Sequence, residues 1–286
     1  HLSIELMIND KCDHKCTYCY FRRSASKLDF PEDAQKPDTL LRNADHFIKW
    51  IDLNKFKASV SLFGGELLSQ EIGYKLVDKL LDSKYIPRIV IPSNMSFIFD
   101  DHRIVKIEEL YTKANKNNKE LFIGASVDGK FMEDNRPMLN GKIRDDVYYD
   151  KLFTFCKNHN IGVHPMIYSN NIEKWKDNYN WFKSKTSKIY LLEVRNKNWT
   201  IKQTKDLCDF YEFLYIKSLE NEGSFFDKLS QDNFLLNDVV EMDRGTSCSI
   251  QTQIHIRLGD LTVFPCHRLM YNGMEYFKFT ESFDIL

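Results

Sequence analysis

The sequence predicts an α/β fold in which parallel strands alternate with helices. Short apolar, β-rich runs recur between residues 2 and 195, and longer segments with an apolar stripe at helical spacing lie between them. The strand runs are apolar along their length, which is typical of strands covered on both faces. Six such strand–helix units in succession therefore indicate a parallel sheet built from βα units.

The expected elements follow one another closely. Strands are expected at 2–8, 58–63, 88–92, 121–127, 162–167 and 189–194. Helices are expected at 39–53, 71–82, 101–118, 146–159, 173–184 and 201–222. Asp38 is available to cap the first helix. After residue 200 the alternation stops, and two short strands around Leu258-Gly259-Asp260 indicate a β-hairpin.

Composition excludes several classes of protein. The 286 residues include 40 Lys and Arg against 41 Asp and Glu, and this balance argues against nucleic acid as a partner. No apolar run approaches the roughly 20 residues that span a bilayer, and no signal peptide opens the chain. We therefore expect a cytoplasmic protein without a membrane partner. The seven cysteines are odd in number and partly clustered, which favours metal binding or catalysis over a disulfide framework.

Three cysteines lie within eight residues directly after the first expected strand. Cys12, Cys16 and Cys19 have the spacing C-x3-C-x2-C. A protein-complete [4Fe–4S] site takes four cysteines, so three thiolates would leave one iron open to a substrate or cofactor. The alternative is a zinc site completed by His14 or a distant cysteine. Structural zinc sites have two spaced ligand pairs, and the sequence does not supply the second pair at that spacing.

This loop resembles the signature of the radical S-adenosylmethionine (radical SAM) superfamily, in which an aromatic residue precedes the last cysteine, as Tyr18 does here. Three further motifs match in order, each at the carboxyl end of an expected strand. They are Gly64-Gly65-Glu66, Ser93-Asn94, and Ser126-Val127-Asp128-Gly129 with Arg136 downstream. Active sites of barrels gather at that face. The resemblance covers about residues 2–195 and implies a partial (β/α)6 TIM-like barrel; Leu67 departs from the proline usual in the family.

The resemblance also implies roles for individual residues. The open iron would bind the amino and carboxylate groups of S-adenosylmethionine, and Glu66 would accept hydrogen bonds from its ammonium group. Electron transfer from the cluster would then yield a 5′-deoxyadenosyl radical that abstracts hydrogen from the substrate. The implied cofactor-binding residues are Tyr18, Gly64, Gly65, Glu66, Ser93, Asn94, Ser126, Asp128, Arg136 and Glu193.

Each of these residues also has a simpler interpretation. Gly-Gly-Glu and Asp-Gly are common turns, and Ser-Asn can be a helix cap. Arg136 alone fits a surface position, Tyr18 fits a packing role over the cluster, and Glu193 fits an ion pair with Arg195. The shared order and strand placement of the motifs, more than any single match, favours the functional interpretation.

A second group of residues lies near the carboxyl end. Cys248 and Cys266 flank the expected hairpin, and Pro265-Cys266-His267-Arg268 resembles the start of a SPASM or twitch extension, which implies an auxiliary iron–sulfur cluster. Two thiolates do not complete such a cluster, and we expect Cys156 and Cys208 to be buried helical residues. The missing ligands then lie beyond Leu286, the cluster is incomplete or different, or the module is degenerate; the abrupt end favours the first.

His267 is the candidate catalytic base. In the related sulfatase maturases an Asp follows the equivalent cysteine and acts as a base, so His267 puts sulfatase maturation itself in doubt. A histidine there still fits proton transfer near neutral pH, and the alternatives are a ligand-orienting or surface histidine.

The combined prediction is a barrel at residues 1–200 and an auxiliary-cluster extension at 201–286. The resemblance implies an enzyme that modifies a peptide or protein by crosslinking, epimerisation or oxidation, as maturases of ribosomally made peptides do. A flavodoxin or ferredoxin would supply the electrons. The alternatives are a radical SAM enzyme with a small-molecule substrate and a non-catalytic iron–sulfur or zinc protein.

Overall fold

The computed structural model describes residues 2–19, 31–194, 199–222, 253–264 and 277–278. Contacts divide the chain into two compact units. Unit 1 comprises His1–Asp13, Cys19–Gly124 and Ser249–Leu286, and unit 2 comprises His14–Tyr18 and Ala125–Cys248. The division passes through the cysteine loop: unit 1 holds both ends of the loop, and unit 2 holds its middle, His14–Tyr18.

Unit 1 is built on a seven-stranded sheet with the order β4-β3-β2-β1-β7-β8-β9. The strands are β1 (Leu2–Met7), β2 (Ala58–Phe63), β3 (Arg88–Ser93), β4 (Glu120–Ala125), β7 (Gln253–Arg257), β8 (Thr262–Phe264) and β9 (Phe277–Lys278). β1 pairs in parallel with β2 and β7, and β2 pairs in parallel with β3. β8 pairs antiparallel with β7 and with β9. The predicted mixed α/β fold with a central parallel sheet and a terminal hairpin is confirmed.

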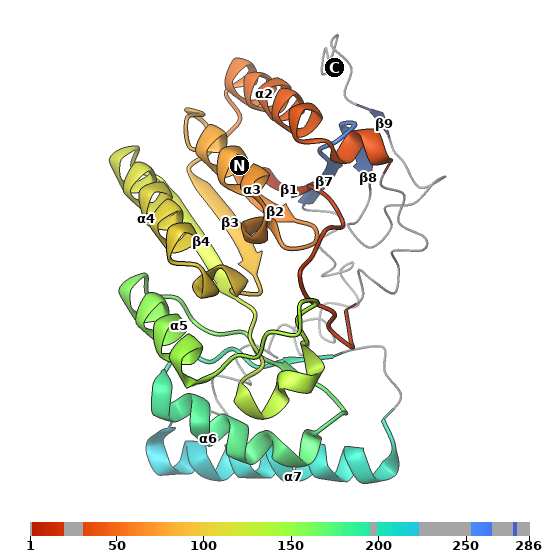
Figure 1. Cartoon of the computed structure of the whole chain (residues 1–286), viewed down its shortest axis with the longest axis vertical. Helices are drawn as coiled ribbons and strands as arrows, with labels where there is room; N and C mark the ends of the chain where they lie inside the picture. Colours follow the sequence, from red (N-terminus) through yellow and green to blue (C-terminus); the bar gives the residue numbers. More distant parts are fainter. Residues whose placement is uncertain (1, 20–30, 195–198, 223–252, 265–276, 279–286) are drawn as a thin grey trace, which may run out of the picture. The chain divides into compact units, whose positions relative to one another are not determined.

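Three amphipathic helices lie side by side along this sheet (Figure 1). They are α2 (Pro37–Asn54), α3 (Glu71–Leu80) and α4 (Asp101–Lys116). Short helical turns precede them: η1 (Glu32–Gln35), η2 (Leu67–Ser69) and η3 (Ser96–Phe99). The expectation that Asp38 caps α2 was wrong. Lys36 is the N-cap residue without a side-chain cap, and Pro37 opens the helix because its fixed φ suits the first position.

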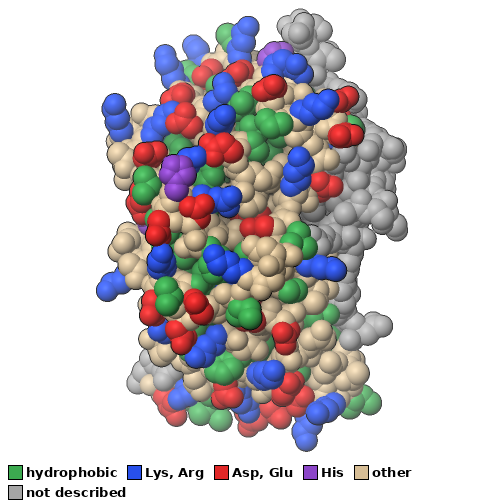
Figure 2. Space-filling view, viewed as in Figure 1, with side chains coloured by type: hydrophobic (Ala, Val, Ile, Leu, Met, Phe, Trp, Pro, Cys, Tyr) green, Lys and Arg blue, Asp and Glu red, His purple; other side chains and the backbone are tan. Residues whose placement is uncertain are grey.

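The two faces of the sheet differ in polarity. Along β2, buried Val60 and Leu62 alternate with half-buried Ser59 and Ser61. Only one face of β2 is fully packed, and the serines lie on the other face. The prediction that this strand is apolar along its length and covered on both faces was wrong. The surface over the helices is charged, and Figure 2 shows basic and acidic side chains interspersed over the face it presents.

Unit 2 is mainly helical. Its helices are η4 (Lys130–Asn135), α5 (Asp146–Asn158), η5 (Ile172–Lys174), α6 (Trp175–Lys185), α7 (Ile201–Lys217) and the π-helix η6 (Ser218–Glu222). α6 and α7 lie side by side (Figure 1) and share a core with Trp175, Tyr179, Phe210 and Leu214. No helix in the described part of the chain is long and apolar enough to cross a membrane. The boundary predicted at residue 200 stays a prediction.

The strands of unit 2 are shorter than predicted. β5 (Met166–Ile167) pairs in parallel with β6 (Leu192–Glu193), and single parallel bridges join Val163 to Ala125 and to Ile189. Pro165 has no N–H to donate within the expected 162–167 strand, which limits regular pairing there. Cys156 is buried as expected. Cys208 is exposed, so the prediction that it is buried was wrong. Cys208 lies on a face of α7 that is turned away from the core.

Candidate cofactor site

The three cysteines of the loop are half-buried. Cys12 and Cys19 belong to unit 1, and Cys16 belongs to unit 2. In unit 1, Cys19 packs against the buried cluster of Met7 and Phe264, as Phe63 at the end of β2 also does. The loop therefore begins and ends at the strand edge that the sequence pattern indicated.

Gly64 and Gly65 allow the backbone of the cysteine loop to pass directly over the end of β2. The N–H of Gly65 donates to the carbonyl oxygen of Asn9 at 2.8 Å, and that of Glu66 donates to Lys11 at 2.8 Å. A Cβ atom on Gly64 would lie 2.5 Å from the Asn9 oxygen, and one on Gly65 would lie 1.8 Å from the Lys11 oxygen. The missing Cβ atoms thus serve the packing of the chain itself, and the predicted contact with a cofactor stays a prediction.

Glu66 joins the ends of β2 and β3. One carboxylate oxygen accepts from Ser93 Oγ at 2.9 Å and from the Leu68 N–H at 3.2 Å, and the other accepts from the Asn94 N–H at 2.5 Å. Burial raises the pKa of Glu66 to about 7. The negative charge of Asp13 also raises this pKa, whereas the three hydrogen bonds lower it. A contact with a cofactor's ammonium group, as the resemblance implies, stays a prediction.

Asn94 reaches the first cysteine of the loop. Its Nδ2 donates to Asp13 Oδ1 at 2.7 Å and lies 4.0 Å from Cys12 Sγ. Its Oδ1 accepts from the Ser96 N–H at 2.9 Å, which fixes the orientation of the amide. Unit 1 thus brings the predicted residue Asn94 to the predicted ligand Cys12, with an amide donor beside the sulfur.

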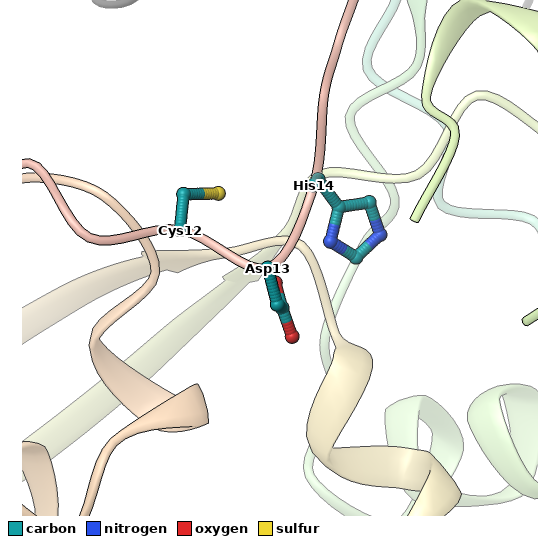
Figure 3. A group of neighbouring side chains, drawn as sticks. All are labelled: Cys12, Asp13 and His14. Atoms are coloured by element: carbon teal, nitrogen blue, oxygen red, sulfur yellow. The ribbon is translucent and has the colours of Figure 1, made fainter. Parts of the chain in front are cut away.

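Cys12, Asp13 and His14 are consecutive, and one ligand atom from each lies within 4.8 Å of the others (Figure 3). This mixed set is the local basis for the zinc alternative. However, the buried ring of His14 contacts the guanidinium of Arg144 through Nε2. A fixed positive charge against the imidazole makes His14 a poor ligand for a second cation.

In unit 2, Asp128 brings together the other predicted residues. It accepts a hydrogen bond from the hydroxyl of Tyr18, and its Oδ1 pairs with Arg136 Nε at 3.1 Å. Arg136 Nη1 also donates to the carbonyl oxygen of Ser126 at 2.7 Å. Burial alone would lower the pKa of Arg136, but Asp128, Tyr18 and Cys16 together raise that pKa well above its ordinary value and keep the guanidinium protonated. The ring of Tyr18 stands edge-on to Tyr168.

The sequence reasoning missed Asn178, which holds Asp128 from α6. Its Nδ2 donates to the Asp128 carbonyl oxygen at 2.7 Å, while the Met166 N–H donates to Asp128 Oδ1 at 3.0 Å. Gly129 has a φ of +95°, and a Cβ there would lie 2.3 Å from Asn178 Oδ1. The available signal was an asparagine on the apolar face of a predicted helix, where a fully buried amide needs a partner.

Several predicted residues lie outside the described part of the chain. Only the backbone of Glu193 is described, as the last residue of β6. Cys248, Cys266, His267 and Arg195 fall outside the described residues, so their roles stay predictions.

The hairpin that separates Cys248 and Cys266 in the sequence is firmly placed in unit 1. Asn43 Nδ2 donates to the carbonyl oxygens of Leu258 and Gly259 at 2.9 and 2.8 Å, and the Leu258 N–H donates to Met7 at 2.9 Å.

Solved structures with a similar fold cover nearly all of this chain. anSMEcpe with bound AdoMet (S-adenosylmethionine) is 19% identical, with a TM-score of 0.65 over 96% of this chain and 77% of that one. anSMEcpe with bound AdoMet and the Cp18Cys peptide is 18% identical, with a TM-score of 0.62 over 96% and 76%. Streptococcus suis SuiB bound to the precursor peptide SuiA is 16% identical, with a TM-score of 0.57 over 96% and 61%.

anSMEcpe was solved with bound AdoMet, the cofactor that the sequence resemblance implies. At such identities the likeness shows a common fold. No protein-family model matches the chain, and no curated protein matches it in sequence.

Proposed function

We propose that this protein is a radical SAM enzyme that modifies a peptide or protein. One observation carries the proposal: in both units, residues of the strand-end motifs contact the cysteine loop. Asn94 lies beside Cys12 in unit 1, and Asp128 holds Tyr18 in unit 2. A chance collection of turn motifs would have no reason to meet the loop in both units.

The donor set fits an iron–sulfur cluster. Cys12, Cys16 and Cys19 are half-buried, and soft thiolate ligands suit iron–sulfur centres. When bound, the cluster supplies the electron that cleaves S-adenosylmethionine. In this proposal Glu66, fixed by Ser93 and Asn94, receives the cofactor's ammonium group.

The residues of unit 2 act on the cofactor and on the loop. Arg136 pairs with Asp128 and donates hydrogen bonds to the Ser126 carbonyl oxygen and the Tyr18 hydroxyl. In this proposal its role is to hold Asp128 and Tyr18 in position. The half-buried Tyr18 ring would then pack against the cofactor and exclude water from it.

A peptide substrate is supported by the solved structures of similar fold. SuiB was solved with its precursor peptide SuiA, and anSMEcpe with the Cp18Cys peptide. The reaction proposed here is crosslinking, epimerisation or oxidation of such a substrate, with electrons from a flavodoxin or ferredoxin.

Residues 201–286 are proposed to form a SPASM- or twitch-like extension with Cys248 and Cys266 as auxiliary ligands and His267 as a base. The described hairpin supports this proposal. β7 begins at Gln253 and β8 ends at Phe264, which faces His255, so both strands meet the adjoining chain at the same end of the hairpin.

The cofactor chemistry is tested by anaerobic reconstitution with iron and sulfide, reduction, and addition of S-adenosylmethionine. We expect about four irons and four sulfides at the loop site, with further iron if the auxiliary site fills, and release of 5′-deoxyadenosine. The Cys16→Ala variant should release none, whereas Cys208→Ala, which removes an exposed thiol of α7, should match the unchanged protein. A fully loaded protein that releases none, or zinc without sulfide, would contradict the proposal.

The substrate class needs a separate experiment. A short peptide encoded beside the gene should accelerate release of 5′-deoxyadenosine and change in mass. Acceleration by small molecules of a neighbouring biosynthetic operon, and not by the peptide, would favour the small-molecule alternative.

A further inference from the structure

The middle of the cysteine loop is hydrogen-bonded to the backbone on either side of Arg136. The Lys15 N–H donates to the carbonyl oxygen of Pro137 at 2.8 Å, and the Thr17 N–H donates to that of Asn135 at 2.9 Å. Cys16 lies between these two hydrogen bonds. Its backbone position is therefore set by residues 135–138, which lie more than 100 positions later in the chain.

Arg144 holds both sides of this contact. Nη1 and Nη2 donate to the carbonyl oxygen of Arg136 at 3.3 and 3.2 Å, at the edge of the backbone segment. Nη2 also contacts the ring of His14, which forms an antiparallel bridge with Met138. One buried guanidinium thus joins the loop to the segment that carries it.

The guanidinium is itself fixed from the other side. Arg144 Nη1 forms an ion pair with Glu133 at 2.5 Å, and the hydroxyl of Tyr149 donates to the same carboxylate. The side chain of Arg144 is only 4% exposed. Its planar fork engages a ring, a carbonyl and a carboxylate at once, and the single ammonium of a lysine cannot reproduce that geometry.

We propose that Arg144 is a positioning residue for Cys16, holding the middle of the loop in its ligand conformation before any cluster binds. The identity of the cluster rests on the proposed function, whereas the loop clamp is a property of the polypeptide alone. A ligand that is already ordered loses less conformational freedom on binding, so the clamp should slow loss of the cluster.

The clamp is tested first in the apoprotein by hydrogen exchange of the amides of Lys15 and Thr17. In Arg144→Lys and Arg144→Met these amides should exchange roughly tenfold faster than in the unchanged protein, because their protection depends on the closed loop. The control is Lys185→Met, which breaks the exposed ion pair with Asp150 in the same unit. Arg144→Lys keeps the buried charge and guards against a variant that fails to fold.

Two exchange results would overturn the proposal. One is unchanged exchange at both amides in a folded Arg144→Lys protein. The other is equally faster exchange throughout unit 2, because that pattern would mean general loosening instead of a local clamp.

Iron retention provides the second readout. After reconstitution, the Arg144 variants should lose iron to a chelator several times faster than Lys185→Met, at a temperature well below unfolding. Equal retention would contradict the positioning role. If the unchanged protein binds no cluster, the proposed function fails, and the exchange experiment still decides whether Arg144 clamps the loop.

Discussion

Glu66 shows how one carboxyl group can be both buried and well hydrogen-bonded. Its side chain is almost fully excluded from water, which disfavours the charged form, while Ser93, Leu68 and Asn94 donate to its oxygens and favour it. Burial prevails, and the pKa of the folded protein rises from the ordinary 4.5 to about 7. A carboxyl group with that pKa changes its charge near neutral pH.

This shift predicts a pH-dependent stability of the apoprotein. Because the folded state binds the Glu66 proton more tightly than the unfolded state, this contribution is lost as pH rises from about 4.5 to 7, by roughly 3 kcal/mol in total. Urea unfolding between pH 5 and 8 should show the decline. Glu66→Gln should flatten it, and the control Glu71→Gln, at an exposed site, should not. A decline that persists in Glu66→Gln would contradict the assignment.

At the scale of elements, turns after the strands are set by close packing. Gly129 follows β4 with a φ of +95° and lies against Asn178 and Phe182 of α6. A residue with a side chain would be strained at this φ and would also clash with α6. Gly141 also has a positive φ, of +72°, but nothing lies within 4 Å of its Cβ position. The two glycines therefore share a positive φ but differ in the space available to a side chain.

The matched pair Gly129→Ala and Gly141→Ala measures that difference. Gly141→Ala should cost about 1 kcal/mol, from the left-handed backbone alone. Gly129→Ala should cost a further 1–3 kcal/mol, roughly, because α6 must move to admit the methyl group. Chemical denaturation of both variants checks this, and equal losses would show that α6 yields without cost.

At the scale of the whole molecule, the sheet of unit 1 depends on distant parts of the chain. β1 at the amino end pairs with β7, about 250 residues later, and Glu5 of β1 contacts His255 of β7 at 2.7 Å. Asn43 of α2 fastens the hairpin that follows. The first strand and the loop after it are thus stabilised by the carboxyl-terminal segment.

A cluster bound only by the folded chain should stabilise the whole molecule through mass action. Under oxygen-free conditions, the reconstituted protein should unfold at a higher temperature than the apoprotein. Thermal unfolding monitored by circular dichroism measures this difference. Cys16→Ala should lose this gain, whereas Cys208→Ala should keep it. A similar gain in Cys16→Ala would mean that the iron binds elsewhere.

The sequence by itself determined the alternation of elements, the hairpin and the motifs that end the strands, because periodicity and turn chemistry are local properties. Asp128, Arg136 and Tyr18 were among the residues predicted to bind the cofactor, and they meet in unit 2. The cap of α2 was missed because Pro37 already opens the helix before Asp38, whereas the exposure of Cys208 depended on which face of α7 met a neighbour.

Only the tertiary structure decided which residues hold those motifs in place. His14 and Arg144 are 130 positions apart, and Asn178 is 50 positions from Asp128. No local pattern marks such pairs, since a buried polar group finds its partner through the course of the chain in space. The sequence thus predicted the cysteine loop, whereas the fold brought the guanidinium of Arg144 to His14 in that loop and the amide of Asn178 to Asp128.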